Sequence, residues 1–202
     1  MTIFCIGRNY IDHAKELNNP VPSEPVVFCK PAGAILRDNK PFYYPSFSKD
    51  VHYEVELLLK IAKPGKAIEE KKAMEYVSHI GLGIDFTARD IQQRCKEKGL
   101  PWEIAKGWDY SALIGDWMEP NELNTQSISF SLKKNNTVVQ NGNSSEMIFS
   151  FEKIISYLST YFRLGTGDII YTGTPAGVGP VSIGDRLEGY IGENRNFWTE
   201  VR

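Results

Sequence analysis

The sequence has little cysteine and histidine, with three of each among 202 residues. The cysteines are scattered and form no C-x-x-C pair: Cys5, Cys29 and Cys95. This pattern argues against a disulfide framework and a cysteine-bound zinc site, and it is typical of thiols in a reducing compartment. So few histidines make a histidine-rich metal centre unexpected. Any metal site in this chain should therefore be built from carboxylates.

Long hydrophobic runs and concentrations of one charge are also missing. No apolar stretch approaches the roughly 18 residues of a membrane span, and the amino terminus lacks the basic-then-apolar pattern of a signal peptide. The formal net charge is −2, and there is no basic stripe for nucleic acid. We therefore expect no membrane or nucleic-acid partner and a cytoplasmic location. With 42% hydrophobic and 24% charged residues, the chain is expected to form one globular domain, residues 1–202.

What the sequence does contain is a pair of glutamates within an apolar run, VHYEVELLLK at residues 51–60. Successive side chains of a strand alternate between its faces, so Glu54 and Glu56 should project from the same side. Adjacent carboxylates repel each other unless a cation, a proton or an arginine lies between them, and Mg²⁺ or Mn²⁺ suits such an oxygen site. The alternative is an ordinary half-buried strand whose glutamates face water.

A second candidate is the pair His13 and Glu16 in a short helical segment, residues 11–17. Residues three apart share a helix face, and a carboxylate beside an imidazole orients it for action as a general base. The pair is equally consistent with an exposed contact on a polar helix. Because a proline-rich loop follows, residues 10–25 have the features of a mobile lid, or of a plain surface turn.

Asp85 lies near the end of an apolar, strand-like segment, residues 79–86. A carboxylate there is unfavourable unless it is paired or binds a metal, although a strand-end aspartate is also common. The pattern T-x-x-D that follows resembles a capping box and predicts a helix from Thr87 to about Lys98, ended by Gly99.

Three more residues suggest recognition of a charged group. Arg89 and Gln92 lie one turn apart on the predicted helix, where they could hold a substrate carboxylate by two contacts, or Arg89 could simply be solvated. Lys106 stands between apolar residues, so it requires an anionic partner if it is buried.

The remaining pattern predicts many strands and few helices. Apolar or alternating runs predict strands at 3–6, 25–31, 128–133, 138–141, 168–172, 184–188 and 197–202. Helical spacing predicts helices at 68–77 and 149–162. Residues 173–180 form a glycine-rich loop that lacks a phosphate-binding signature, but its backbone can approach a small ligand closely.

Taken together, these segments resemble the fumarylacetoacetate hydrolase family, especially its short acylpyruvase and oxaloacetate-decarboxylase-like members. The matching segments are GRNYIDHAKE at 7–16, FCKP at 28–31, YEVEL at 53–57, GIDFTARDIQ at 83–92, KGLPWEIAKGWD at 98–109, SSEMIFSFEKIISYLS at 144–159 and GDIIYTGTPAGVGPVSIGD at 167–185. The resemblance extends in order along nearly the whole chain. The additional amino-terminal domain of the larger fumarylacetoacetate hydrolases has no counterpart among these segments, which argues against fumarylacetoacetate itself as substrate.

The resemblance implies an α+β, β-rich fold, a mixed β-sandwich roll with a few short helices, and a homodimer. It implies that Glu54, Glu56 and Asp85 bind Mg²⁺ or Mn²⁺, and that His13 and Glu16 form a catalytic dyad on a lid. Lys106 would also be catalytic. Substrate contacts are expected from Arg8, Lys30, Arg89, Gln92 and Thr174.

The activity implied is metal-dependent cleavage of a C–C bond in acylpyruvates, or decarboxylation of oxaloacetate, through a metal-stabilised pyruvate enolate. The substrate would be a small α-keto acid. One alternative is an isomerase or tautomerase of 2-oxo-dicarboxylates of the 2-hydroxyhepta-2,4-diene-1,7-dioate type in aromatic catabolism. Another is a dimeric protein that binds a keto acid without converting it.

Overall fold

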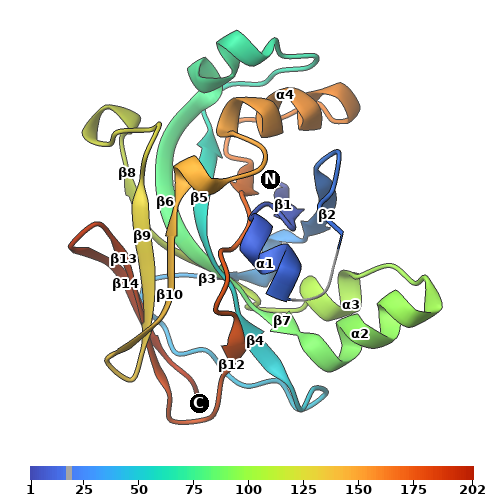
Figure 1. The fold of residues 1–202 in the computed structure, drawn as a ribbon, viewed down its shortest axis with the longest axis vertical. Coiled ribbons are helices and arrows are strands. Elements are labelled where there is room, and N and C mark those ends of the chain that lie inside the picture. The colour runs from blue at the N-terminus through green and yellow to red at the C-terminus, as the bar shows by residue number, and fades with distance from the viewer. Residues whose placement is uncertain (17–19) are drawn as a thin grey trace.

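A computed structural model describes residues 1–16 and 20–202 of the chain (Figure 1). Residues 17–19 of the expected lid lie outside the described residues. The strands are β1 (Ile3–Gly7), β2 (Val26–Lys30), β3 (Ile35–Leu36), β4 (Val51–Tyr53), β5 (Val55–Ile61), β6 (Val77–Asp85), β7 (Thr87–Ala88), β8 (Ala112–Met118), β9 (Ser129–Lys134), β10 (Thr137–Asn143), β11 (Ile169–Tyr171), β12 (Gly179–Pro180), β13 (Arg186–Ile191) and β14 (Asn194–Glu200). The helices are α1 (Ile11–Glu16), α2 (Arg89–Lys98), α3 (Glu103–Lys106) and α4 (Phe151–Tyr161). This composition confirms the prediction of a β-rich α+β fold with few short helices.

A seven-stranded mixed sheet, in the order β2-β1-β11-β5-β6-β8-β3, forms the centre of the molecule. Its middle strands β5 and β6 pair antiparallel, with Glu56 opposite Gly83. Both faces of these strands are buried, because successive residues such as Leu57, Leu58 and Leu59 are all inaccessible to solvent. That continuous burial explains why the segments read as apolar runs.

A four-stranded antiparallel sheet, β10-β9-β13-β14, packs against one face of the central sheet. In Figure 1 it lies at the left, while α1, α2 and α3 lie at the right. One hydrophobic cluster joins the two sheets and includes Leu57 and Leu82 from the central sheet with Phe130 and Leu187 from the smaller one. The arrangement is a curled sandwich with a continuous core between its layers.

The third sheet is small, with the order β12-β4-β7, and it lies beside the functional residues. The expected single strand at residues 51–60 is therefore divided, because β4 pairs with β7 and β12 whereas β5 belongs to the central sheet. Glu54 is the residue between them. The chain thus changes sheets at one of the three predicted metal ligands.

The helices differ from the sequence predictions in two places. The segment predicted as an amphipathic α-helix, residues 68–77, forms a 3₁₀ helix at Glu70–Tyr76 that packs on α4, and three shorter 3₁₀ turns occur elsewhere. Ala73 of this segment is buried, and Met74 and Tyr76 pack against the main hydrophobic cluster, so tertiary packing decides its conformation. The predicted capping box at α2 is also wrong, because the N-cap is Ala88 with no side-chain hydrogen bond. Gly99 ends α2 as predicted, with a φ of 63°.

Within residues 1–16 and 20–202, no helix is long and apolar enough to span a bilayer.

Candidate functional site

Three carboxylates converge where the central sheet meets the small sheet. Glu54 follows β4, Glu56 lies on β5, and Asp85 ends β6; the chain is fixed there by a 2.8 Å hydrogen bond from the Asp85 amide to the Glu54 carbonyl. Glu54, Glu56 and Asp85 are only 5%, 2% and 0% exposed, and each offers an oxygen atom within 4.8 Å of the others. The water-facing alternative for the two glutamates is therefore wrong.

Lys106 is buried among these carboxylates, as its apolar flanks indicated. It ends α3, and its Nζ atom donates to Glu54 Oε2 at 2.7 Å, Asp85 Oδ2 at 2.6 Å and Thr87 Oγ1 at 2.6 Å. Burial opposes the charged form, but the carboxylates of Asp85 and Glu54 outweigh it and raise the pKa of Lys106. Thr87 is thus engaged by the site, which explains why it caps no helix.

Lys30, at the end of β2, lies behind Asp85 and does not line the cavity. Its Nζ atom is 2.6 Å from Asp85 Oδ1, and it donates to the Phe86 carbonyl and to both the carbonyl and hydroxyl of Ser111. With these partners satisfied, Lys30 holds Asp85 in place and joins β2 to the end of β6.

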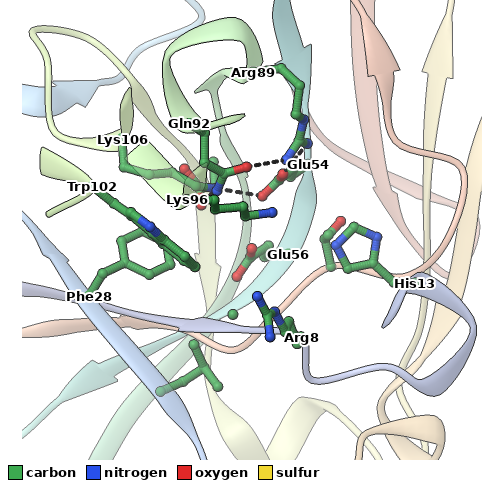
Figure 2. A pocket seen from close by; sticks show the side chains of 14 residues that line it. Arg8, His13, Phe28, Glu54, Glu56, Arg89, Gln92, Lys96, Trp102 and Lys106 are labelled. Carbon is green, nitrogen blue, oxygen red and sulfur yellow. Dashed lines mark hydrogen bonds and ion pairs between the residues drawn. The ribbon is translucent and has the colours of Figure 1, made fainter. Parts of the chain in front are cut away.

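Arg89 and Gln92 contact each other and the carboxylate cluster. Arg89 Nη1 donates to Gln92 Oε1 at 2.7 Å, and Arg89 Nη2 donates to Glu54 Oε1 at 2.5 Å (Figure 2). Burial alone would raise the pKa of Glu54, but the charges of Lys106 and Arg89 outweigh it and hold that pKa well below its usual range. Arg89 is therefore already paired and is not a solvated surface cation.

Glu56 has the weakest compensation of the three carboxylates. Its Oε2 atom accepts one hydrogen bond of 2.6 Å, from the Gly173 amide. Burial, followed by repulsion from Asp85 and Glu54, raises the pKa of Glu56 well above its usual range. Asp85, by contrast, is paired with Lys30 Nζ at Oδ1 and with Lys106 Nζ at Oδ2, each at 2.6 Å. A divalent cation would relieve the repulsion that Glu56 meets among these hard oxygen donors, so the residues fit Mg²⁺ or Mn²⁺.

His13 faces the carboxylates from α1. The ring is buried, and its Nδ1 atom lies 3.4 Å from Glu16 Oε2. Burial lowers the pKa of His13 below its ordinary value of 6.5, although Glu54 and Glu16 oppose that shift, so the imidazole is neutral at pH 7. Glu16 is held in turn by the Gly177 amide, which donates to its two oxygens at 3.1 and 3.2 Å.

The glycine-rich loop supplies two backbone contacts and one side chain. Its Gly173 and Gly177 amides bind Glu56 and Glu16, as described, and both glycines have positive φ angles, 104° and 96°. The Thr174 hydroxyl lines the cavity but is occupied, since it donates to the Val55 carbonyl and accepts from Gln140 Nε2, each at 2.8 Å. The loop therefore approaches the site closely with its backbone, as the glycines indicated.

These residues surround a cavity of about 30 Å³. All predicted site residues line it except Lys30 and Glu16, which hold Asp85 and His13 from behind. That volume has room for one or two water molecules or an ion, since one water needs about 10–15 Å³ of this space.

Four further side chains line the cavity without having been predicted from the sequence: Ile6, Phe28, Lys96 and Trp102. Lys96 was detectable, because it follows Gln92 by four residues and Arg89 by seven, and residues at that spacing share a helix face. Trp102 and Phe28 gave no such signal. Their rings, 5.9 Å apart between centroids, form the apolar wall of the cavity.

Comparison with known proteins places this architecture in a family. The family model for the fumarylacetoacetate (FAA) hydrolase C-terminal region matches residues 2–198. The chain is 43% identical over 190 residues to mitochondrial oxaloacetate tautomerase FAHD1 from Mus musculus, covering 94% of this chain and 86% of that protein. It is 41% identical over 188 residues to mitochondrial oxaloacetate decarboxylase from Dictyostelium discoideum, covering 92% and 86%. The crystal structure of fumarylpyruvate hydrolase from Pseudomonas aeruginosa in complex with Mn²⁺ and pyruvate superposes with a TM-score of 0.94 at 37% identity, covering 100% of this chain and 89% of that one.

Proposed function

The chain belongs to the fumarylacetoacetate hydrolase family, and on that basis we propose that it is a Mg²⁺-dependent enzyme that converts oxaloacetate through its enolate. The observation that carries this proposal is the buried cluster of three carboxylates around Lys106, faced by a neutral histidine. The names of the relatives from Mus musculus and Dictyostelium discoideum support oxaloacetate as substrate. The Mn²⁺ complex of the structural relative supports a divalent ion at Glu54, Glu56 and Asp85.

When bound there, Mg²⁺ supplies a Lewis acid for the charge that develops on the keto oxygen. Lys106 adds a fixed positive charge at the same place, and because its pKa is raised it acts as an electrostatic stabiliser and not as an acid or base. In tautomerisation, His13 accepts a proton from C3 of oxaloacetate, and a proton is returned to the C2 oxygen to give the enol. In decarboxylation, the C3–C4 bond breaks, CO₂ leaves, and the resulting enolate is protonated at C3 to give pyruvate.

A second candidate activity, acylpyruvate hydrolysis, is favoured by one observation. His13 is neutral, oriented by Glu16 and directed at the cavity, which is the arrangement that activates a water molecule. Water would add to the C4 carbonyl, the C3–C4 bond would break, and the products would be pyruvate and a carboxylic acid. Decarboxylation requires no such base, so the two activities differ in their need for His13.

We propose that part of the cavity wall moves when substrate enters. We assign that movement to α1, because the contacts of Glu16 with the Gly177 amide are few compared with those that hold the sheet residues. Residues 10–25 as a lid, the homodimer, the single domain and the cytoplasmic location remain predictions of the sequence.

The experiment is to assay the purified protein with oxaloacetate and acetylpyruvate, with Mg²⁺ and then with EDTA, following the enol by absorbance and pyruvate by a coupled assay. We expect Mg²⁺-dependent turnover of oxaloacetate. In Glu56→Gln, activity should fall by more than about a hundredfold, since even outer-shell changes at metal sites cost ten- to hundredfold. Glu69→Gln, at an exposed glutamate, is the matched control. Tight keto-acid binding without turnover of either substrate would contradict the proposal and indicate a binding protein.

A further inference from the structure

Two cations line the cavity without a carboxylate partner. Two other cations line the same cavity and are paired: Lys106 with Glu54 and Asp85, and Arg89 with Glu54. Lys96 and Arg8 line the same cavity, yet within the described part of the chain neither forms an ion pair. Glu54 and Asp85 are already paired with Lys106, Arg89 and Lys30, so Lys96 and Arg8 are not needed to balance those two carboxylates.

Both side chains are directed at the same space. Lys96 extends from α2, with its Nζ atom 5.7 Å from the centroid of the Trp102 ring. Arg8 directly follows β1 in a left-handed conformation, with a φ of 62°, which non-glycine residues seldom adopt. In Figure 2 the two side chains approach the space beside Glu56 from opposite sides. Backbone strain of this kind is typical of residues whose position matters to a site.

Holding these cations together is unfavourable without an anion. Lys96 is half-buried, and burial, followed by repulsion from Arg89 and Arg8, lowers the pKa of Lys96. A divalent ion at the carboxylates would add more positive charge to the same cavity. A ligand with a single negative charge, held at the metal, would leave Lys96 and Arg8 unpaired.

We propose that Lys96, assisted by Arg8, binds the distal carboxylate of a dianionic keto acid and so sets the preference for a dicarboxylate over a neutral acyl chain. The inference rests on the proposed function, because it assumes that the keto-acid end lies at Glu54, Glu56 and Asp85. The Trp102 and Phe28 rings line the cavity beside Lys96, so its ammonium group lies against an apolar wall. Lys96 is a specificity-determining residue, since it touches the end of the substrate remote from the reacting keto group.

The test compares substrates with and without the distal charge. In Lys96→Met, the KM for oxaloacetate should rise about ten- to hundredfold, the loss expected for one charge-assisted hydrogen bond, while kcat changes little. The KM for acetylpyruvate should stay within about twofold, since its acetyl end carries no charge. Lys96→Arg should restore most of the oxaloacetate KM. Lys98→Met, at an exposed lysine on the same helix, is the matched control and should leave both values unchanged.

A binding measurement separates this inference from the proposed reaction. Malate and lactate share a 2-hydroxy-acid end and differ in the distal carboxylate, so calorimetry with Mg²⁺ should show a preference for malate that Lys96→Met abolishes. Loss of that preference would support the subsite even if no turnover were found. An equal loss of affinity for both ligands, or an unchanged preference, would overturn it. A protein that turns over neither keto acid but discriminates malate through Lys96 would refute only the proposed function.

Discussion

The carboxylate–lysine cluster and helix α1 face each other across one cavity but are held in very different ways. Glu54, Asp85 and Lys106 lie at the ends of sheet strands and of α3, are buried, and have several charged or hydrogen-bonded partners each. His13 is also buried, but it lies on a helix of six residues, and its ring has one hydrogen-bond partner among the described residues, Glu16, at 3.4 Å. A helix this short has little stability of its own.

The difference separates two tasks of the site. Charges that must bind an ion are fixed in advance, which avoids reorganisation when charge develops in the reaction. The base lies on the short helix to which we assign the movement that admits substrate. Changes in the cluster should therefore affect both folding and activity, whereas changes at α1 should affect activity alone.

The largest effect is expected for Lys106→Met. The substitution leaves Glu54 and Asp85 buried without their shared cation, and removing one partner of a buried pair costs about 3–5 kcal/mol. Thermal unfolding should show a melting temperature lower by roughly 10 °C, since 1 kcal/mol corresponds to about 2–4 °C at this size. Activity should fall with it. Lys98→Met, an exposed lysine, should change neither, and a variant of Lys106 with unchanged stability would contradict the comparison.

A smaller effect, confined to activity, is expected at His13. Because the pKa of His13 is lowered from 6.5, the neutral base is present at pH 7 and is lost only as the pH falls through that lowered pKa. Acetylpyruvate hydrolysis should therefore show an acid limb below pH 6.5, and His13→Ala should reduce it about 10²–10⁴-fold. Stability should change little, as thermal unfolding of the same variant would show. An acid limb that persists in His13→Ala would assign the titration to another group.

The smallest effect is expected for Gly177→Ala. A Cβ atom there would lie 2.3 Å from the Val139 carbonyl oxygen, so the loop must shift and its amide moves away from Glu16. We expect kcat to fall roughly tenfold, which is less than the 10²–10⁴-fold rate enhancement of a fully positioned general base, because His13 itself is retained. Hydrogen exchange of residues 11–16 should be faster. Gly184→Ala has the same φ of 96° and no neighbour within 4 Å of the added atom, so it reproduces the backbone strain alone. If hydrogen exchange of residues 11–16 were equally fast in the two variants, the contact between Gly177 and Glu16 would not be what holds α1.

The sequence predicted the charged centre better than its surroundings. The spacing of Glu54 and Glu56, and the apolar flanks of Lys106, are local patterns, and local patterns report burial well. The change of sheets at Glu54 and the use of the Thr87 hydroxyl by Lys106 depend on strands that meet only in the folded protein. Tertiary contacts of that kind override capping and strand propensity.

Lys30 and Lys96 show which positions a local sequence pattern can predict and which it cannot. Lys30 was expected to touch substrate, but its position behind Asp85 follows from a contact between residues 55 apart in the chain, which no local pattern reveals. Lys96 lies on the face of α2 already defined by Arg89 and Gln92. It could have been found by extending that helical spacing by one turn.

The hydrogen bond between the Gly173 amide and Glu56 also constrains the order in which the chain can assemble. It joins residues 117 apart, and β1 pairs in parallel with β11, so that Ile3 lies beside Ile169. Closing loops this long is entropically unfavourable, and folds dominated by such contacts form slowly. During synthesis the ribosome must deliver residue 173 before Glu56 gains its partner. Until then β5 lacks its neighbour β11, so one edge of the strand is unpaired. A nascent chain at this stage is most prone to misfolding.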